Sequence, residues 1–381
     1  MRGAMKKYHL SVLFVLCISL VYSQNTLIQE YELSGADAYE LPSISPDNDI
    51  FMIMASKAYV GTYYLQCNLN EKMDAPDRLF NDNSKKKKNR RGRKKARSTI
   101  EESMVGWLRY GGTQYLYYML NNTSSNPILS TMYSFPFGDQ GQEVLEEFQT
   151  SSPNTPNVSL VMNDSEGIII SYLNGPYGYH HYVFDEEGVV ISTPTFFDLP
   201  GPVQSISQWS NKDVLILEGQ ENIYHLWNSN SSENWEPSRL NVDLSDYTIF
   251  GSINCHPENN HIFSFLASTV DRMKMNKADL CIYDLKKGRV IKTIEVYAPS
   301  EPYRGTEYSQ WSKEYNRLYF LRQNEKEHIQ SFYYDVGSDR TMASGIPDNR
   351  IKSFTVSVKG DRLATIAYPD GGHVRVYSID E

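Results

Sequence analysis

The chain has 381 residues, a formal net charge of −9 and an aromatic content of 13%, including 28 Tyr. This length fits one large domain or about two to three ordinary domains, so internal repeats must decide the domain organisation. Tyr is favoured on pleated, half-buried surfaces, and its abundance favours an all-β fold. One of the four cysteines, Cys17, lies in the N-terminal apolar run, and the odd number that remains excludes a fully paired disulfide framework.

Residues 1–23 have the pattern of a cleavable secretory signal, with a basic start, an apolar run over residues 10–21 and the small Ser23 before Gln24. The apolar run is too short to span a bilayer. We therefore expect a secreted or periplasmic protein, monomeric, with no transmembrane segment after cleavage. A lipidated Cys17 and a buried N-terminal strand are the alternatives for this segment.

A strand, turn and strand pattern recurs in residues 24–381 and indicates a repeated β-structure. The tetrapeptide Ser-Gln-Trp-Ser opens the pattern twice, at residues 207–210 and 309–312, and each time a polar turn and an apolar run follow. Looser copies lie at residues 43–54, 160–170 and 253–266. The clearest copy is the C-terminal segment, residues 350–381, in which two turns separate three short alternating strands.

An aromatic residue followed by Asp, or by a polar replacement, ends the third predicted strand of several copies. The pairs are Phe184-Asp185, Trp227-Asn228, Tyr283-Asp284, Tyr334-Asp335 and Tyr377-Ser378. In this feature the chain resembles the WD-repeat superfamily, whose blades close their third strand with an aromatic residue and Asp. The Ser-Pro-Asp-Asn turn at residues 45–48 is similar to TolB-like blades to the same degree. The resemblance covers most of residues 24–381 and implies a β-propeller.

Counting the first-hairpin turns gives a single seven-bladed β-propeller, with turns near residues 47, 111, 164, 212, 258, 314 and 360. Six or eight blades also fit, because residues 107–150 are the least regular. The last blade ends after its third strand. The resemblance implies that the N-terminus supplies the missing outer strand, for which residues 26–33 are the candidate. This pairing would close the ring and remove an open sheet edge.

A basic run interrupts the first repeat interval. Ten residues between positions 85 and 97 are basic: Lys85, Lys86, Lys87, Lys88, Arg90, Arg91, Arg93, Lys94, Lys95 and Arg97. So dense a run repels itself, and we expect residues 73–101 to form a disordered insertion. Outside the cell the run would bind polyanions through counterion release. A solvated insertion without function, a processing site at residues 90–93 and a nuclear import signal are the alternatives.

The sequence contains no tight catalytic motif: no nucleophile elbow, no phosphate-binding glycine loop, no Cys-x-x-Cys pair and no His-Glu-x-x-His. We therefore predict no catalytic residues and no cofactor. His180, His181 and Asp185 come nearest to a metal cluster, but adjacent histidines on a strand point to opposite faces, so no metal site is predicted. Cys255 and Cys281 fall on the first and third strands of one blade and are expected to be buried thiols.

Aromatic residues gather in the loops that join second to third strands and one blade to the next, which emerge on the same face of a propeller. The predicted ligand-binding residues on this face are Tyr177, Tyr179, His180, Phe196, Phe197, Tyr303 and Arg304. Tyr and Arg are typical of contact surfaces. Packing of these rings between blades is the alternative. We place the basic insertion after the third strand of its blade, which would project it from the opposite face.

The sequence thus predicts an exported, non-catalytic propeller that binds a protein or glycan partner. The first alternative is a propeller hydrolase or lyase that acts on a polymer, because one scaffold can host both functions. The second alternative is an intracellular, nuclear WD-type scaffold, which requires that the signal is not used.

Overall fold

The computed structural model describes the backbone of residues 26–32, 38–45, 50–57, 61–68, 77–78, 100–110, 113–122, 129–137, 143–149, 157–162, 167–173, 178–184, 195–198, 203–208, 214–218, 222–228, 235–273, 277–297, 309–312, 316–323, 328–348, 350–357, 360–367 and 373–379. Within these ranges the chain is nearly all β-structure, with one short helix, α2 (Val270–Met273). No helix in the described ranges is long and apolar enough to cross a bilayer.

The described strands form seven four-stranded antiparallel sheets. Six sheets contain consecutive strands: β2 to β5 (Ala38–Ile44, Ile50–Lys57, Gly61–Asn68, Asp77–Arg78), β6 to β9 (Ile100–Tyr110, Thr113–Asn122, Leu129–Phe137, Glu143–Gln149), β10 to β13 (Asn157–Met162, Gly167–Leu173, Gly178–Phe184, Thr195–Asp198), β14 to β17 (Val203–Gln208, Val214–Glu218, Asn222–Asn228, Trp235–Arg239), β18 to β21 (Thr248–Cys255, Ile262–Ser268, Lys277–Asp284, Arg289–Tyr297) and β22 to β25 (Ser309–Ser312, Arg317–Gln323, Ile329–Asp335, Arg340–Ala343). The seventh sheet contains β26 (Ile351–Val356), β27 (Arg362–Ala367), β28 (His373–Ser378) and, from the other end of the chain, β1 (Leu27–Glu32).

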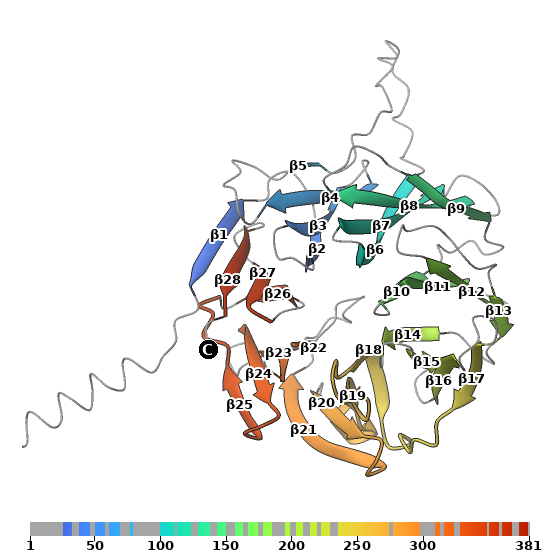
Figure 1. Ribbon diagram of the computed structural model, residues 1–381. Coiled ribbons are helices and arrows are strands. Elements are labelled where there is room, and N and C mark those ends of the chain that lie inside the picture. The colour runs from blue at the N-terminus through green and yellow to red at the C-terminus, as the bar shows by residue number, and fades with distance from the viewer. Residues whose placement is uncertain are drawn as a thin grey trace, which may run out of the picture.

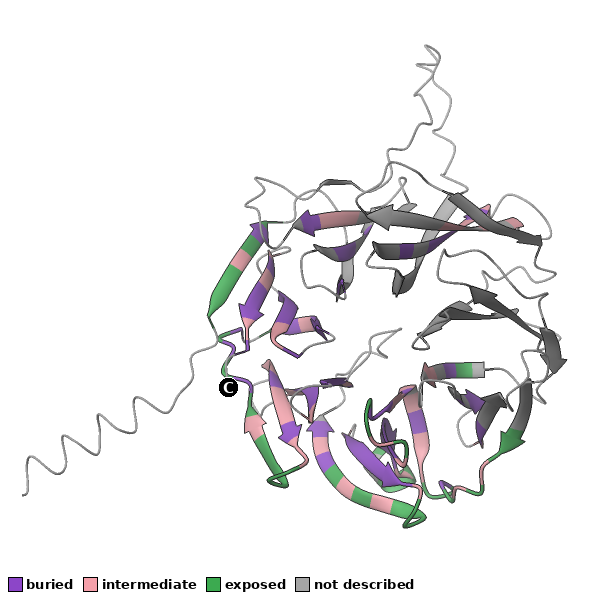
Figure 2. Cartoon of the chain, viewed as in Figure 1, coloured by how far each residue is buried: buried purple, intermediate pink, exposed green. Residues whose placement is uncertain are grey.

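The sheets are arranged in a circle, and each places one edge strand near the centre and the other at the outside (Figure 1). Neighbouring sheets contact one another mainly through their first strands, in the pairs β2 and β26, β6 and β10, β10 and β14, β14 and β18, β18 and β22, and β22 and β26. The sheet of β2 to β5 contacts the sheet of β6 to β9 through β4 and β6. Figure 2 shows the consequence for burial, since β26, β27 and β20 are mostly buried whereas the outer strands β1, β21 and β25 are exposed over much of their length.

The hairpins that the repeated pattern predicts are present. Strands pair antiparallel on either side of each predicted turn. The first Ser-Gln-Trp-Ser begins at the end of β14, which pairs with β15, and the second forms β22, which pairs with β23. The N-terminal strand candidate, residues 26–33, is β1. It pairs antiparallel with β28, with Glu30 opposite Arg375 and Tyr31 opposite Val374.

The repeated tetrapeptide links neighbouring sheets. The Gln310 side chain on β22 accepts a hydrogen bond from the Val356 backbone N–H (2.8 Å) and donates to the Val356 carbonyl (3.1 Å). In the earlier copy, Ser207 Oγ accepts a bond from the backbone N–H of Cys255 on β18 (3.1 Å). Because β18 and β26 are edge strands of their sheets, these side chains satisfy backbone groups that would otherwise be unpaired.

The aromatic and acidic pair at the end of the third strand has two separate roles. Tyr283, Tyr334 and Tyr377 are buried and pack in the clusters between sheets. Asp335, which follows Tyr334, accepts hydrogen bonds from the Ser338 backbone N–H (2.7 Å) and hydroxyl (2.9 Å). The ring therefore contributes apolar burial, and the carboxylate shapes the turn to the outer strand.

The cysteines are confirmed as thiols in the core. Cys67, Cys255 and Cys281 are free and buried. Burial raises the pKa of the Cys255 thiol to about 12, so this thiol is protonated at neutral pH.

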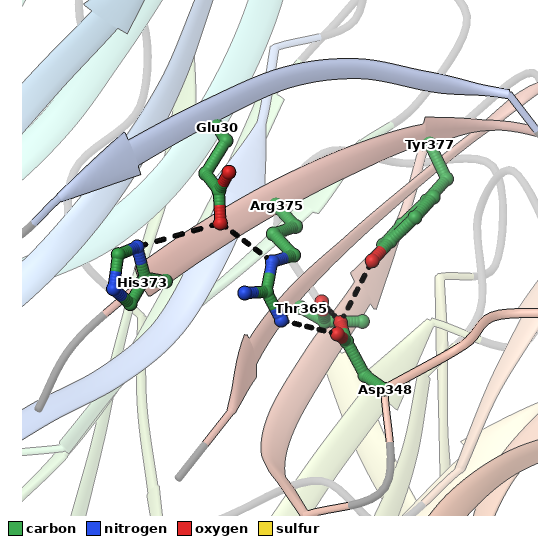
Figure 3. A network of polar contacts seen from close by, with 6 residues as sticks. All are labelled: Glu30, Asp348, Thr365, His373, Arg375 and Tyr377. Atoms are coloured by element: carbon green, nitrogen blue, oxygen red, sulfur yellow. Dashed lines mark hydrogen bonds and ion pairs between the residues drawn. The ribbon is translucent and has the colours of Figure 1, made fainter. Parts of the chain in front are cut away.

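A network of polar side chains fastens β1 to the end of the chain (Figure 3). Arg375 on β28 lies between two carboxylates and donates to Glu30 of β1 (2.7 Å) and to the buried Asp348. Asp348 also accepts hydrogen bonds from the hydroxyls of Thr365 (2.8 Å) and Tyr377 (3.0 Å). The guanidinium thus connects the first strand of the chain to the segment before β26.

The expected position of the basic insertion requires correction. We placed it after the third strand of its blade, but β5 (Asp77–Arg78) follows the third strand β4 and pairs with it. The basic run at residues 85–97 therefore lies between β5 and β6 in the chain. β5 and the first residues of β6 also fall within residues 73–101, whereas the basic residues themselves lie outside the described ranges.

Candidate functional site

A polar groove of about 510 Å³ lies between the sheet of β18 to β21 and the sheet of β22 to β25. Turns from both sheets form it, on the side where first strands turn into second strands and third strands turn into fourth strands. The lining residues are His256, Glu258, Asn259, Asn260, His261, Asp284, Lys286, Asn316 and Val336. Its volume is within the range of about 300 to 1,000 Å³ that is typical of small-molecule sites.

His256 is a buried lining residue of this groove and joins its two sides. Its Nδ1 accepts hydrogen bonds from the backbone N–H groups of Glu258 (3.2 Å) and Asn259 (3.0 Å), so the proton of the neutral ring is on Nε2. Nε2 donates to Oδ1 of Asn316, which belongs to the neighbouring sheet. The ring also lies against Trp311, with ring centroids 4.6 Å apart.

Burial lowers the pKa of His256 below its ordinary value, although the hydrogen bond to Asn316 and the charge of Glu258 act in the opposite direction. The imidazole is therefore neutral at pH 7, and both of its nitrogens are already in hydrogen bonds. A ring in this state can hold a turn and a neighbouring sheet, but it has no nitrogen available to accept a proton from a ligand.

Asp284 is also committed to the structure of the groove. Its Oδ1 accepts hydrogen bonds from the backbone N–H groups of Lys286 (2.9 Å) and Lys287 (3.2 Å), and its Oδ2 is 3.3 Å from the Lys287 ammonium. Burial by itself would raise the pKa of this carboxyl, but the bonds from Lys287 and Lys286 lower it below its ordinary value. The carboxylate is ionised at neutral pH and acts as a fixed acceptor.

The left-handed conformation of Asn316, with φ of 50°, brings this amide to the groove. Asn tolerates this region better than most residues. The Asn316 carbonyl accepts a hydrogen bond from the Val336 backbone N–H (3.3 Å), which ties two turns of the second sheet together. In the first sheet, Leu285 N–H donates to the His261 carbonyl (2.7 Å) in the same way. Backbone bonds between turns thus hold both walls in place.

The structure brings four predicted ligand-binding residues together at one end of a sheet. Backbone pairing places Tyr179 opposite Phe197 and His180 opposite Phe196 on strands β12 and β13. Tyr177, Tyr303 and Arg304, together with the ten basic residues of the run, lie outside the described ranges. The pairs on β12 and β13 are at the end where the second strand turns into the third, which is the opposite side from the groove.

Sequence reasoning missed the groove. It identified residues 257–260 as a turn and Asp284 as the end of a strand, but it did not show that these segments face Asn316 of the next sheet. The signal that was present is the concentration of amide and imidazole side chains at residues 256–261. In the described ranges, no three His, Cys, Asp or Glu side chains are placed to hold a metal ion together.

No protein-family model matches the chain, and no curated protein matches its sequence. Solved structures do match it in three dimensions. A proposed 6-phosphogluconolactonase from Bacteroides uniformis is 14% identical, with a TM-score of 0.52 over 87% of this chain and 92% of that one. The β-propeller domain of the Trilobed protease from Pyrococcus furiosus, which has an open velcro topology, is 11% identical, with a TM-score of 0.54 over 90% of this chain and 95% of that one.

The fold is that of a β-propeller. The circular arrangement of four-stranded sheets and the similarity to the Pyrococcus domain both support this class. At these identities the similarity concerns the fold alone, and a propeller scaffold hosts many functions. Function must therefore be argued from the groove and the surfaces of this chain.

Proposed function

We propose that this chain is an exported, non-catalytic β-propeller that binds a protein or glycan partner. The observation that carries the proposal is the state of the groove. It is hollow and polar, yet its buried imidazole, His256, uses both ring nitrogens to hold Glu258, Asn259 and Asn316. A hydrolase or lyase that used this buried imidazole as its acid or base would need a ring nitrogen that is free to exchange a proton with the substrate.

We further infer that the seven sheets are the seven blades of a ring, of the WD-like arrangement, that β1 closes. The pairing of β1 with β28 and the contacts between each sheet and the next support this. A closed ring positions its surface turns rigidly, and rigid elements favour a binding site because less motion is lost when the ligand binds.

Two surfaces can bind the partner in this proposal. One is the aromatic face, represented among the described residues by Tyr179 and Phe197, and the other is the groove on the opposite side, represented by Asn260. The signal pattern of residues 1–23 supports export, and a partner would then be met outside the cytoplasm.

The test is capture of a partner by the immobilised mature chain, residues 24–381, from the extracellular fraction of its own source. We expect one protein or glycan to be retained in a fixed ratio. Its retention should fall either in the double variant Tyr179→Ala/Phe197→Ala or in the single variant Asn260→Ala, depending on which surface binds it. Cleavage of a polysaccharide or protein by the purified chain, without a stable complex, would instead support the hydrolase or lyase. N-terminal sequencing of the expressed product should begin near Gln24, whereas an intact Met1 would support the intracellular scaffold.

A further inference from the structure

Four side chains of the groove make no hydrogen bond or ion pair within the part of the chain that the structure describes. They are those of Glu258, Asn260, His261 and Lys286. Glu258, Asn260 and Lys286 are exposed, and His261 is half-buried. The buried groups of the groove hold its shape, whereas the polar atoms of these four side chains remain available for a ligand.

The charges of the described residues that line the groove nearly balance. Glu258 and Asp284 are acidic, Lys286 is basic, and the Lys287 ammonium lies 3.3 Å from Asp284. His256 is neutral, because burial lowers its pKa. A ligand of high charge would meet both signs at close range, so the groove favours a ligand without net charge.

The described lining of the groove is also poor in apolar side chains. Val336 is the single apolar side chain among the described residues that line it. Peptides bind mainly by burying aromatic or aliphatic side chains in pockets, with polar contacts around them. Among the described residues, a lining with one half-buried Val offers no such pocket, and this observation favours a glycan over a peptide.

The lining matches hydroxyl groups. A hydroxyl donates one hydrogen bond and accepts two. The amide of Asn260 both donates and accepts, Lys286 only donates, and Glu258 only accepts. Neighbouring hydroxyls on a sugar ring can pair with this mixture without leaving a donor or an acceptor unsatisfied.

We propose that the groove between the sheets of β18 to β21 and β22 to β25 binds a segment of a neutral, hydroxyl-rich glycan. This inference rests on the proposed binding function and names the ligand class for one of its two surfaces. The groove lies on surface turns, so a longer chain can extend beyond the segment that is bound.

Affinity electrophoresis of the full chain in native gels tests this proposal. The gels contain laminarin, hydroxyethyl cellulose, galactomannan, xyloglucan or dextran, which are all neutral, and salt is high enough to suppress binding by the basic run. We expect at least one of these polymers to retard the chain. Asn260→Ala and Lys286→Ala should each weaken binding about two- to tenfold, which corresponds to the loss of one hydrogen bond. The control is Thr293→Ala on the exposed face of β21, which should bind as the parent does.

Two outcomes would overturn the inference: no retardation by any of the five polymers, or equal retardation of the parent, Asn260→Ala and Lys286→Ala. These outcomes are distinct from failure of the proposed function. A captured protein partner whose retention falls in Asn260→Ala would leave the binding function standing and would show that the groove takes a protein.

Discussion

His256 occupies the turn position that a serine occupies in the last sheet. His256 N–H donates to the Ile262 carbonyl (2.9 Å), as Ser357 N–H does to the Arg362 carbonyl (3.0 Å). Ser357 Oγ accepts backbone N–H bonds from Gly360 and Arg362 (both 3.1 Å), and His256 Nδ1 accepts them from Glu258 and Asn259. The imidazole therefore accepts backbone hydrogen bonds of the turn, as the serine hydroxyl does, and in addition donates a hydrogen bond to Asn316 of the next sheet.

This replacement predicts a pH-dependent contribution to stability. Because burial lowers the pKa of His256 from its ordinary value of 6.5, the unfolded chain binds a proton at this ring more readily than the folded chain. The contribution is complete above the unfolded pKa and is lost as the pH falls through 6.5 toward the lower folded pKa. A protonated Nδ1 would also lie against the N–H groups of Glu258 and Asn259, from which it could no longer accept hydrogen bonds.

The variant that tests this is His256→Ser, since serine can cap the same turn. At about pH 8 we expect its free energy of unfolding to be lower by about 1 to 2 kcal/mol, because the bond to Asn316 and the contact with Trp311 are lost. At about pH 5 the difference between variant and parent should shrink. Urea unfolding at both pH values measures it, and a difference that is the same at both would contradict the assigned state of the ring.

At the scale of the element, the hairpins could be predicted because their determinants are local. Alternation of apolar residues fixes each strand, and Gly, Pro, Asn and Asp fix each turn. Residues 351–378 illustrate this, since all three strands expected there are present. β1 could be predicted for a different reason, because the last predicted blade lacked an outer strand and residues 26–33 were the nearest candidate.

The groove and β5 could not be predicted because their determinants are not local. β5 has only two residues, Asp77–Arg78, and neither has a strand preference, so its pairing with β4 depends on position in the sheet. The groove joins turns near positions 256, 284, 316 and 336, which meet because two sheets are neighbours. Gln310 is similar, because its bonds to Val356 appear only once the sheets are in place.

β1 pairs with β28 at the other end of the chain, and we expect its loss to destabilise the whole domain and not the N-terminus alone. Tyr31 is buried in a cluster with Ile44 and Ile53 of one sheet and Val374 and Val376 of another. We expect Tyr31→Ala to lower the free energy of unfolding by about 3 kcal/mol. Deletion of residues 24–35 should lower it further and reduce the melting temperature of the entire domain in calorimetry.

Two variants of the polar network, one expected to be mild and one severe, serve as controls for this prediction. Glu30→Gln should cost less than about 1 kcal/mol, because Glu30 is partly exposed and its ion pair with Arg375 is screened by water. Arg375→Leu should cost about 3 to 5 kcal/mol, because it leaves the buried Asp348 without its cation. A deletion variant with an undiminished melting temperature would show that β1 does not hold the sheets together.

At the scale of the whole molecule, charge is distributed very unevenly. The run at residues 85–97 contributes ten positive charges to a chain whose formal net charge is −9, so the rest of the chain is strongly acidic. In the chain the run lies between β5 and β6, outside the described residues. An acidic body would repel a polyanion, and the run would have to supply the attraction.

Removal of this attraction should abolish salt-sensitive binding to heparin while it leaves the fold intact. We expect a chain without residues 85–97 to elute from a heparin column at much lower salt than the parent, because fewer counterions are released when the polymer binds. A second variant keeps the length of the loop and replaces the ten Lys and Arg residues by Ser and Gly, so that charge and loop length are separated. Both variants should melt at the temperature of the parent, since long surface insertions affect stability little. Equal elution of all three proteins would show that the basic run does not bind polyanions and would leave it as a solvated insertion.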